Sequence, residues 1–126
     1  MRMRDEVIWD EFIKNNPDSF SQVWYNVPLG EPFKDPRLRR EAKNNGAWEA
    51  TQWRIDVLAE SDFAYYVIEI KPNAMGGALG QALAYKALLE KHYVLEKPVL
   101  PIVLTDVVGE ITDEAARLLG VQVIIP

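Results

Sequence analysis

The apolar segment Val99–Leu104 restricts the fold of this chain more than any other stretch of the sequence. Its residues, Val-Leu-Pro-Ile-Val-Leu, show no alternation of apolar and polar side chains. This pattern predicts a strand over residues 98–105 that is buried on both faces. The segment before it, residues 78–92, is dense in Ala and Leu and predicts a helix. A fully buried strand after a helix indicates a sheet that helices cover on both faces.

The remaining segments predict an α/β fold in one domain, residues 1–126, because the length suits a single domain. Residues 28–47 contain several Pro and Gly and predict a long loop with a short helix around residues 37–43. Thr112 is the expected N-cap of the last helix, and Gly120 is its expected C′ residue. The expected elements are a helix over 5–15, a strand over 22–27, a hairpin of strands 48–59 and 63–71, a helix over 78–92, a strand over 98–105, a helix over 113–119 and a strand over 121–125. The order α-β-β-β-α-β-α-β predicts a mixed β-sheet flanked by helices.

Three charged residues occur within the otherwise apolar strands of the predicted hairpin, namely Asp56, Glu69 and Lys71. A buried charge without a partner is costly, so their presence needs a reason. Side chains alternate between the faces of a strand, so Glu69 and Lys71 share a face. A hairpin turn of even length pairs Asp56 with Val67, which places Asp56 on the face of Glu69, one diagonal step away.

The two carboxylates predict a divalent-metal site. Asp56 and Glu69 offer hard oxygen ligands that suit Mg²⁺ or Mn²⁺, and the main-chain carbonyl of Ile70 is a candidate for a further ligand. Lys71 is then placed to orient or help deprotonate an attacking water and to neutralise phosphate charge. The alternative interpretation is an exposed strand face that carries a Glu–Lys ion pair.

Gln81 and Tyr85 lie four residues apart in the predicted helix 78–92 and therefore share one helix face. They are candidates for a polar pair that faces the carboxylates. The alternative is a pair on the helix surface or at the edge of the core.

These motifs resemble those of the PD-(D/E)XK nuclease superfamily, which has the restriction-endonuclease-like fold. Arg54-Ile55-Asp56-Val57 is similar to the first motif, with Ile55 in place of the usual proline, and Val67-Ile68-Glu69-Ile70-Lys71 is similar to the second. Gln81-x-x-x-Tyr85 resembles the helix motif of RecB-type nucleases, in which both side chains face the active site. The small size is similar to that of Holliday-junction resolvases. The resemblance implies that Asp56 and Glu69 bind the metal, that Lys71 supports the water, and that the function lies in DNA repair or recombination.

Members of the superfamily often add a glutamate from the first helix. Glu11 is the candidate here, with Glu6 behind it, because Glu11 interrupts the apolar face of that helix. The four tryptophans are expected in the core or an interface rather than in a base-stacking platform, and Trp53 is assigned to the core side.

Composition limits the partners and the compartment. The net charge is −5, which argues against simple nucleic-acid binding, and all of it lies in residues 47–126. A basic cluster in the long loop is either a phosphate contact or a solvated loop with local acidic partners; its members are Lys34, Arg37, Arg39, Arg40 and Lys43. The chain has no cysteine, no run of about 18 apolar residues and no secretory start, so we expect a cytoplasmic protein without a membrane partner.

The leading hypothesis is a Mg²⁺- or Mn²⁺-dependent deoxyribonuclease. A homodimer would suit duplex or branched DNA, and a monomer or ring would suit ends or single strands. The second hypothesis is a catalytically silent nuclease-like module for DNA binding or protein assembly. A third is a nuclease that acts only when a partner protein supplies the DNA-binding surface.

Overall fold

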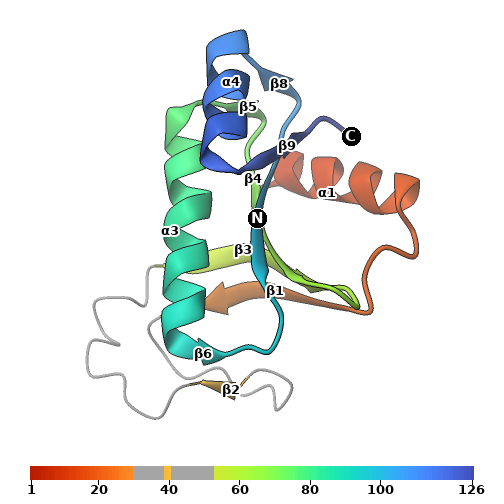
Figure 1. Cartoon of the computed structure of the whole chain (residues 1–126). Helices are drawn as coiled ribbons and strands as arrows, with labels where there is room; N and C mark the ends of the chain where they lie inside the picture. The colour runs from red at the N-terminus through yellow and green to blue at the C-terminus, as the bar shows by residue number, and fades with distance from the viewer. Residues whose placement is uncertain (30–38, 41–52) are drawn as a thin grey trace.

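A five-stranded mixed sheet forms the middle layer of the molecule, and helices cover both of its faces (Figure 1). The computed structural model describes residues 1–29, 39–40 and 53–126, with only the backbone of residues 39–40. Helix α1 lies on one face of the sheet, and helices α3 and α4 lie on the other (Figure 1). This arrangement confirms the predicted mixed sheet flanked by helices and the predicted order of the main elements.

The bounds of the main elements lie close to the predicted ones for residues that the structure describes. The helices are α1 (Met3–Asn15), α3 (Gly76–His92) and α4 (Glu110–Leu119), and the sheet strands are β1 (Gln22–Pro28), β3 (Arg54–Glu60), β4 (Tyr65–Ile70), β7 (Val99–Leu104) and β9 (Gln122–Ile124). Two small ladders were not predicted: β2 (Arg39–Arg40) with β6 (Tyr93–Val94), and β5 (Asn73–Ala74) with β8 (Val107–Val108). None of the helices in the described ranges is long and apolar enough to cross a membrane.

Strand β4 is the central strand of the sheet order β1-β3-β4-β7-β9. It pairs antiparallel with β3 on one edge and parallel with β7 on the other. The parallel pairing is possible because α3 connects the two strands across one face of the sheet. Both edges of β4 are therefore hydrogen-bonded, which leaves its side chains enclosed by the layers above and below.

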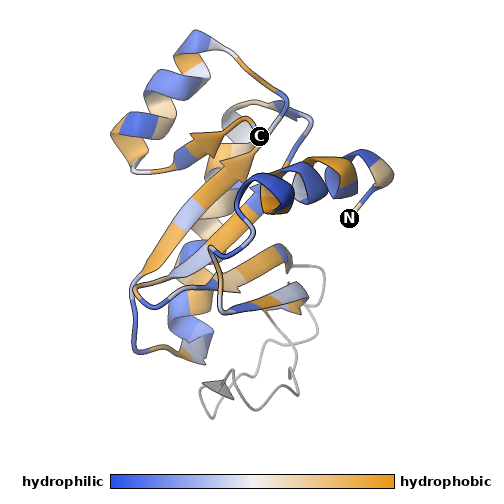
Figure 2. Ribbon diagram, turned by 90° about the vertical axis from the view of Figure 1, so that its right-hand side faces the viewer, coloured by the Kyte–Doolittle hydropathy of each residue, from blue (hydrophilic) through white to orange (hydrophobic). Residues whose placement is uncertain are grey.

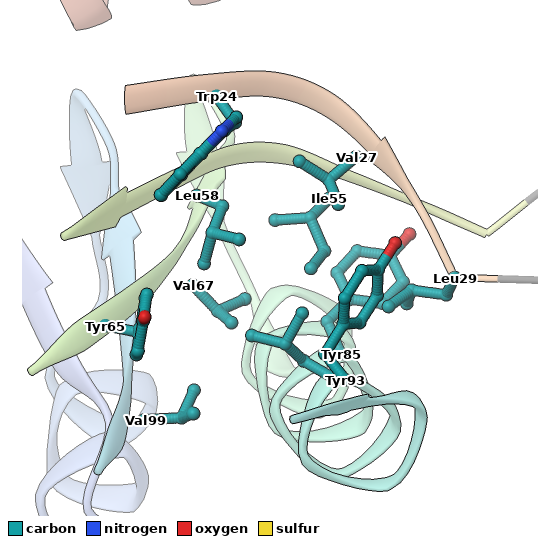
Figure 3. Packing of buried hydrophobic residues seen from close by; sticks show 11 residues of the cluster. Trp24, Val27, Leu29, Ile55, Leu58, Tyr65, Val67, Tyr85, Tyr93 and Val99 are labelled. Carbon is teal, nitrogen blue, oxygen red and sulfur yellow. The ribbon is translucent and has the colours of Figure 1, made fainter. Parts of the chain in front are cut away.

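Hydrophobic residues predominate in the strands of the sheet (Figure 2), and their side chains build a core on each face. On the α1 side, Ile68 and Ile70 of β4 pack with Ile8 and Phe12. On the α3 side, Val67 packs in a cluster with aromatic residues (Figure 3). Burial of large apolar side chains is the main favourable contribution to folding, so these two cores hold the three layers together.

The hairpin register differs from the predicted one by two residues, although the parity is the same. Glu60 pairs with Tyr65, so the turn contains four residues instead of two. Ser61 stabilises this wider turn, because its Oγ accepts the backbone N–H groups of Phe63 and Ala64 at 3.2 and 3.3 Å. The predicted pairing of Asp56 with Val67 is therefore wrong. Val67 pairs with Leu58, and the same register continued would place Asp56 opposite Glu69.

Strand β3 changes face beside Asp56. The pairing of β1 with β3 skips Asn26 and Asp56. Asn26 has a φ of 52°, in the left-handed region that Asn tolerates better than most residues. Ile55 packs on the α3 side of the sheet and Val57 on the α1 side, whereas residues two apart in a regular strand share a face. Irregularities of this kind redirect a side chain, and here Ile55 lies on the other face from the one that alternation predicts.

Two further local predictions are corrected by the structure. Helix α4 begins after Gly109, so Thr112 lies inside the helix and is not its N-cap. Gly120, by contrast, caps the end of α4 with a φ of 75°, as predicted for a C′ glycine. Of the short helix expected around residues 37–43, the described part is Arg39–Arg40, which forms strand β2. The expected strand residues 48–52 and the rest of the basic cluster lie outside the described residues.

We expect Gly80→Ala to stabilise the fold and Gly120→Ala to destabilise it. A Cβ added at either position meets no atom within 4 Å, so the two substitutions differ in backbone conformation alone. Gly80 lies inside α3, where alanine should add about 0.5–1 kcal/mol to the free energy of unfolding. Gly120 has a left-handed φ, where alanine should cost about 1–2 kcal/mol. Urea unfolding of both variants measures the difference, and changes of the same sign would contradict it.

Candidate active site

Glu69 is a carboxylate buried in the centre of the fold. It is 2% exposed and lies near the end of β4, between Ile68 and Ile70. Its backbone pairs with that of Val103 in β7, so the side chain lies on the face that α3 covers. Its Oε2 atom is buried and has no hydrogen-bond partner among the described residues. A buried carboxylate oxygen without a partner is costly, which makes this atom a candidate ligand for a cation.

Asp56 approaches the same point from the neighbouring strand. Its Oδ2 accepts a hydrogen bond from the backbone N–H of Ile70 at 3.3 Å. This bond ties the side chain of Asp56 to the residue that follows Glu69. The peptide carbonyl of Ile70 therefore belongs to a segment that borders both carboxylates, although its role as a ligand stays a prediction.

The pKa of Glu69 is raised from 4.5 to about 8. Burial is the largest cause, because it penalises the charged form. The nearby Asp56 carboxylate raises the pKa further through its negative charge and a hydrogen bond. Lys71 opposes these effects, but it does not outweigh them. The negative charges of two neighbouring carboxylates repel each other, and a bound divalent cation stabilises the state in which both are ionised.

Lys71 extends from the end of β4 toward solvent. Its Nζ lies 3.9 Å from Glu69 Oε1, and its side chain is 45% exposed. The backbone N–H of Lys71 donates to the carbonyl of Leu104 at 3.0 Å, which holds the residue beside the end of β7. The ammonium group is therefore both close to Glu69 and open to solvent, where an incoming anion could contact it.

Helix α3 brings Gln81 and Tyr85 to the carboxylate side of the sheet. Gln81 Nε2 donates to the hydroxyl of Tyr85 at 2.7 Å, and Tyr85 is buried in the cluster between α3 and the strands (Figure 3). Burial raises the pKa of Tyr85, the hydrogen bond from Gln81 lowers it, and the charges of Glu69 and Asp56 raise it. Tyr85 is thus close enough to both carboxylates to sense their charge.

Neither of the two glutamates expected from helix α1 is among the groups that shift the pKa of Glu69. Glu11 is exposed, and its charge acts on Arg4 rather than on Glu69. Glu6 is also exposed. The charge of Asp5, in the first turn of α1, contributes to the raised pKa of Glu69.

The structure corrects the assignment of Trp53. Trp9 and Trp24 are buried as expected, but Trp53 is 43% exposed. Its indole meets the ring of Tyr85 edge-on, with ring centroids 5.7 Å apart. Trp53 comes directly before β3 and lies beyond the face change in that strand, so alternation along β3 does not place it. Trp48 lies outside the described residues.

The residues present fit a site for one divalent ion with few protein ligands. Within the described ranges, no group of three or more acidic or histidine side chains could hold a metal, so Glu11 does not join Asp56 and Glu69. Mg²⁺ commonly binds through one or two carboxylates and keeps several waters. The free Oε2 atom of Glu69 beside Asp56 provides that smaller set.

Two solved structures share the fold of this chain. One is a repair endonuclease from Pyrococcus abyssi, with a TM-score of 0.58, 18% identity and coverage of 94% of this chain and 45% of that one. The other comes from the structure of an EndoMS–dsDNA complex, with a TM-score of 0.53, 21% identity and coverage of 94% and 42%. The chain therefore spans less than half the length of either neighbour. No protein-family model matches the sequence, and no curated protein matches it. At these identities the likeness shows a nuclease-type fold.

In the metal-free protein, the free energy of unfolding should fall as the pH rises from about 4.5 to about 8. Over this range folded Glu69 keeps a proton that the unfolded chain has lost, so rising pH favours unfolding. Glu69→Gln is neutral at every pH and should remove the part of the slope that corresponds to about one proton. Urea unfolding in EDTA across this range measures both proteins. Identical pH slopes for the variant and the wild type would contradict the assignment.

Proposed function

We propose that this protein is a divalent-metal-dependent deoxyribonuclease of the PD-(D/E)XK superfamily, which hydrolyses phosphodiester bonds in DNA. The observation that carries the proposal is the buried, unpartnered Oε2 of Glu69 beside the Asp56 carboxylate. Lys71 lies beside this pair, and the Gln81–Tyr85 pair lies across it on α3. An ordinary surface ion pair would not require a carboxylate to be buried in the centre of a sheet.

Asp56 and Glu69 would hold Mg²⁺ or Mn²⁺, with the Ile70 carbonyl as a further ligand. When bound, such an ion lowers the pKa of a coordinated water and stabilises the charge that builds up on a phosphate in the transition state. The bond from the Ile70 N–H keeps Asp56 in place without the ion. A preorganised carboxylate pair reduces the rearrangement that binding requires.

Lys71 would act on the water and on the phosphate. Its Nζ, near Glu69 Oε1, is positioned to orient the attacking water or to take part in its deprotonation. The exposed part of the side chain places positive charge where a phosphate would enter. Gln81 would fix the Tyr85 hydroxyl, and the two together would position the substrate backbone.

The structural neighbours support DNA as the substrate. One is described as a repair endonuclease, and the other was determined as a complex with double-stranded DNA. Their chains are more than twice as long as this one, so DNA-binding surface beyond these 126 residues would complete the substrate site. A basic partner protein would also offset the net charge of −5, whereas a second copy would double it.

A second candidate function is a catalytically silent nuclease-like module for DNA binding or protein assembly, and the net charge favours the protein-assembly form of it. All of the −5 falls in residues 47–126, which contain the candidate site. Such a module would show no dependence on divalent ions, and Lys71→Ala would have little effect on its function.

The two functions are separated by a cleavage assay on labelled duplex, single-stranded, flap and four-way-junction DNA with Mg²⁺ or Mn²⁺. We expect metal-dependent cleavage that Asp56→Ala abolishes and that Lys71→Ala slows by about 100-fold or more, because both remove groups that act on the reacting water or phosphate. Lys91→Ala removes an exposed lysine near the end of α3 and serves as the matched control.

Retained cleavage by a folded Asp56→Ala protein would overturn the proposed site. Cleavage of none of the substrates by the wild type, with or without metal, would favour the silent module. Equal losses in Lys71→Ala and Lys91→Ala would show that Lys71 contributes general positive charge and no specific chemistry.

A further inference from the structure

A hollow in the surface lies beside the Gln81–Tyr85 pair. It has a volume of about 510 Å³ and is lined by Trp53, Gly77, Gly80, Gln81, Ala84 and Tyr85. We call this the Trp53 hollow. Its volume falls within the range of roughly 300–1,000 Å³ that is typical of sites for small molecules.

The indole of Trp53 forms one wall of the hollow. It is 43% exposed, so a large part of the aromatic surface is open to solvent. The edge-on contact with Tyr85, at an interplanar angle of 82°, supports the indole from one side. Tyr85 is itself buried and hydrogen-bonded to Gln81. An exposed indole supported by a fixed ring offers a surface on which a flat aromatic group can stack.

Small residues form the facing wall. Gly77, Gly80 and Ala84 lie at helical spacing along one face of α3 and expose the helix backbone. A Cβ built at Gly77 or Gly80 meets no atom within 4 Å, so the space above the helix is open. A planar ligand could therefore reach the hollow without displacing a side chain.

The polar groups of the hollow are shared with the candidate active site. Gln81 and Tyr85 line the hollow, and Tyr85 also senses the charges of Glu69 and Asp56. Gln81 gives one amide hydrogen to Tyr85, and its carboxamide has a second hydrogen and an oxygen that can bind to the edge of a base. A group bound in the hollow would consequently lie on the other side of the Gln81–Tyr85 pair from the candidate active site.

We propose that the Trp53 hollow binds an unpaired nucleobase of the DNA substrate, stacked on the indole of Trp53. This inference rests on the proposed nuclease function and specifies its substrate class. A base inside a duplex has its faces covered by neighbouring bases, so it must leave the stack to reach an aromatic side chain. The preferred substrate is therefore DNA with an unpaired nucleotide beside the cleaved bond.

The test measures binding to a single-stranded oligonucleotide that contains 2-aminopurine, in EDTA so that no DNA is cleaved. We expect the wild type to quench the 2-aminopurine fluorescence. Trp53→Leu and Gly80→Leu should each weaken binding about tenfold, the first by removing the stacking surface and the second by filling the hollow. Both positions are solvent-exposed, so the variants should fold, which circular dichroism checks. Phe63→Ala removes an aromatic residue that is 82% exposed in the β3–β4 turn and is the matched control.

Absence of quenching, or equal affinities for the wild type and both hollow variants, would overturn the base-binding role. A fully paired duplex of the same sequence is the second arm, and the same dependence on Trp53 for duplex binding would also overturn it. The binding assay does not depend on cleavage, so the two proposals can fail separately. A wild type that quenches 2-aminopurine but cleaves no DNA would contradict the proposed nuclease function and support the base-binding site. A wild type that cleaves DNA but does not quench 2-aminopurine would support the nuclease function and contradict the base-binding site.

Discussion

Strand β4 is enclosed on both faces and hydrogen-bonded on both edges, and the carboxylate near its end has to be neutralised by something other than bulk water. Glu69 meets this constraint only in part. Lys71 is 3.9 Å away and half-exposed, Asp56 adds negative charge, and one oxygen has no partner among the described residues. The cost of this arrangement is tolerable because Glu69 can keep a proton when no cation is bound. An apolar side chain at position 69 would make the fold more stable, so the presence of Glu69 is explained by a chemical role rather than by a contribution to stability.

The layers around β4 serve both the core and the site. Helix α3 covers the sheet with apolar residues on one side, and its Gln81–Tyr85 pair separates the carboxylates from the Trp53 hollow. Helix α1 packs on the opposite face, and its first turn brings the charge of Asp5 to Glu69. The hydrophobic core holds both helices in place. The proposed metal site, the lysine beside it and the Trp53 hollow would therefore keep a fixed geometry relative to one another.

Much of this arrangement could be predicted from the sequence, because it depends on periodicity. The continuous apolar run in β7 and the alternation around Glu69 determine which strands are buried, and an even-length turn keeps Asp56 and Glu69 on the same side. Sequence periodicity does not show the extra turn residues that Ser61 stabilises or the face change at Asn26 and Asp56, because both depend on pairing between strands. Trp53 was misassigned for the same reason. Asp5 was missed because its relation to Glu69 arises only when α1 packs on the sheet.

The most direct test of a cation site at Glu69 is calorimetric titration of Mn²⁺ into the protein near neutral pH, in buffers of different ionisation enthalpy. We expect one ion to bind and to release about one proton, because Glu69 must lose its proton when it becomes a ligand. Glu69→Gln should bind weakly and release none. Binding by the Gln variant with the same affinity and the same proton release as the wild type would contradict the account.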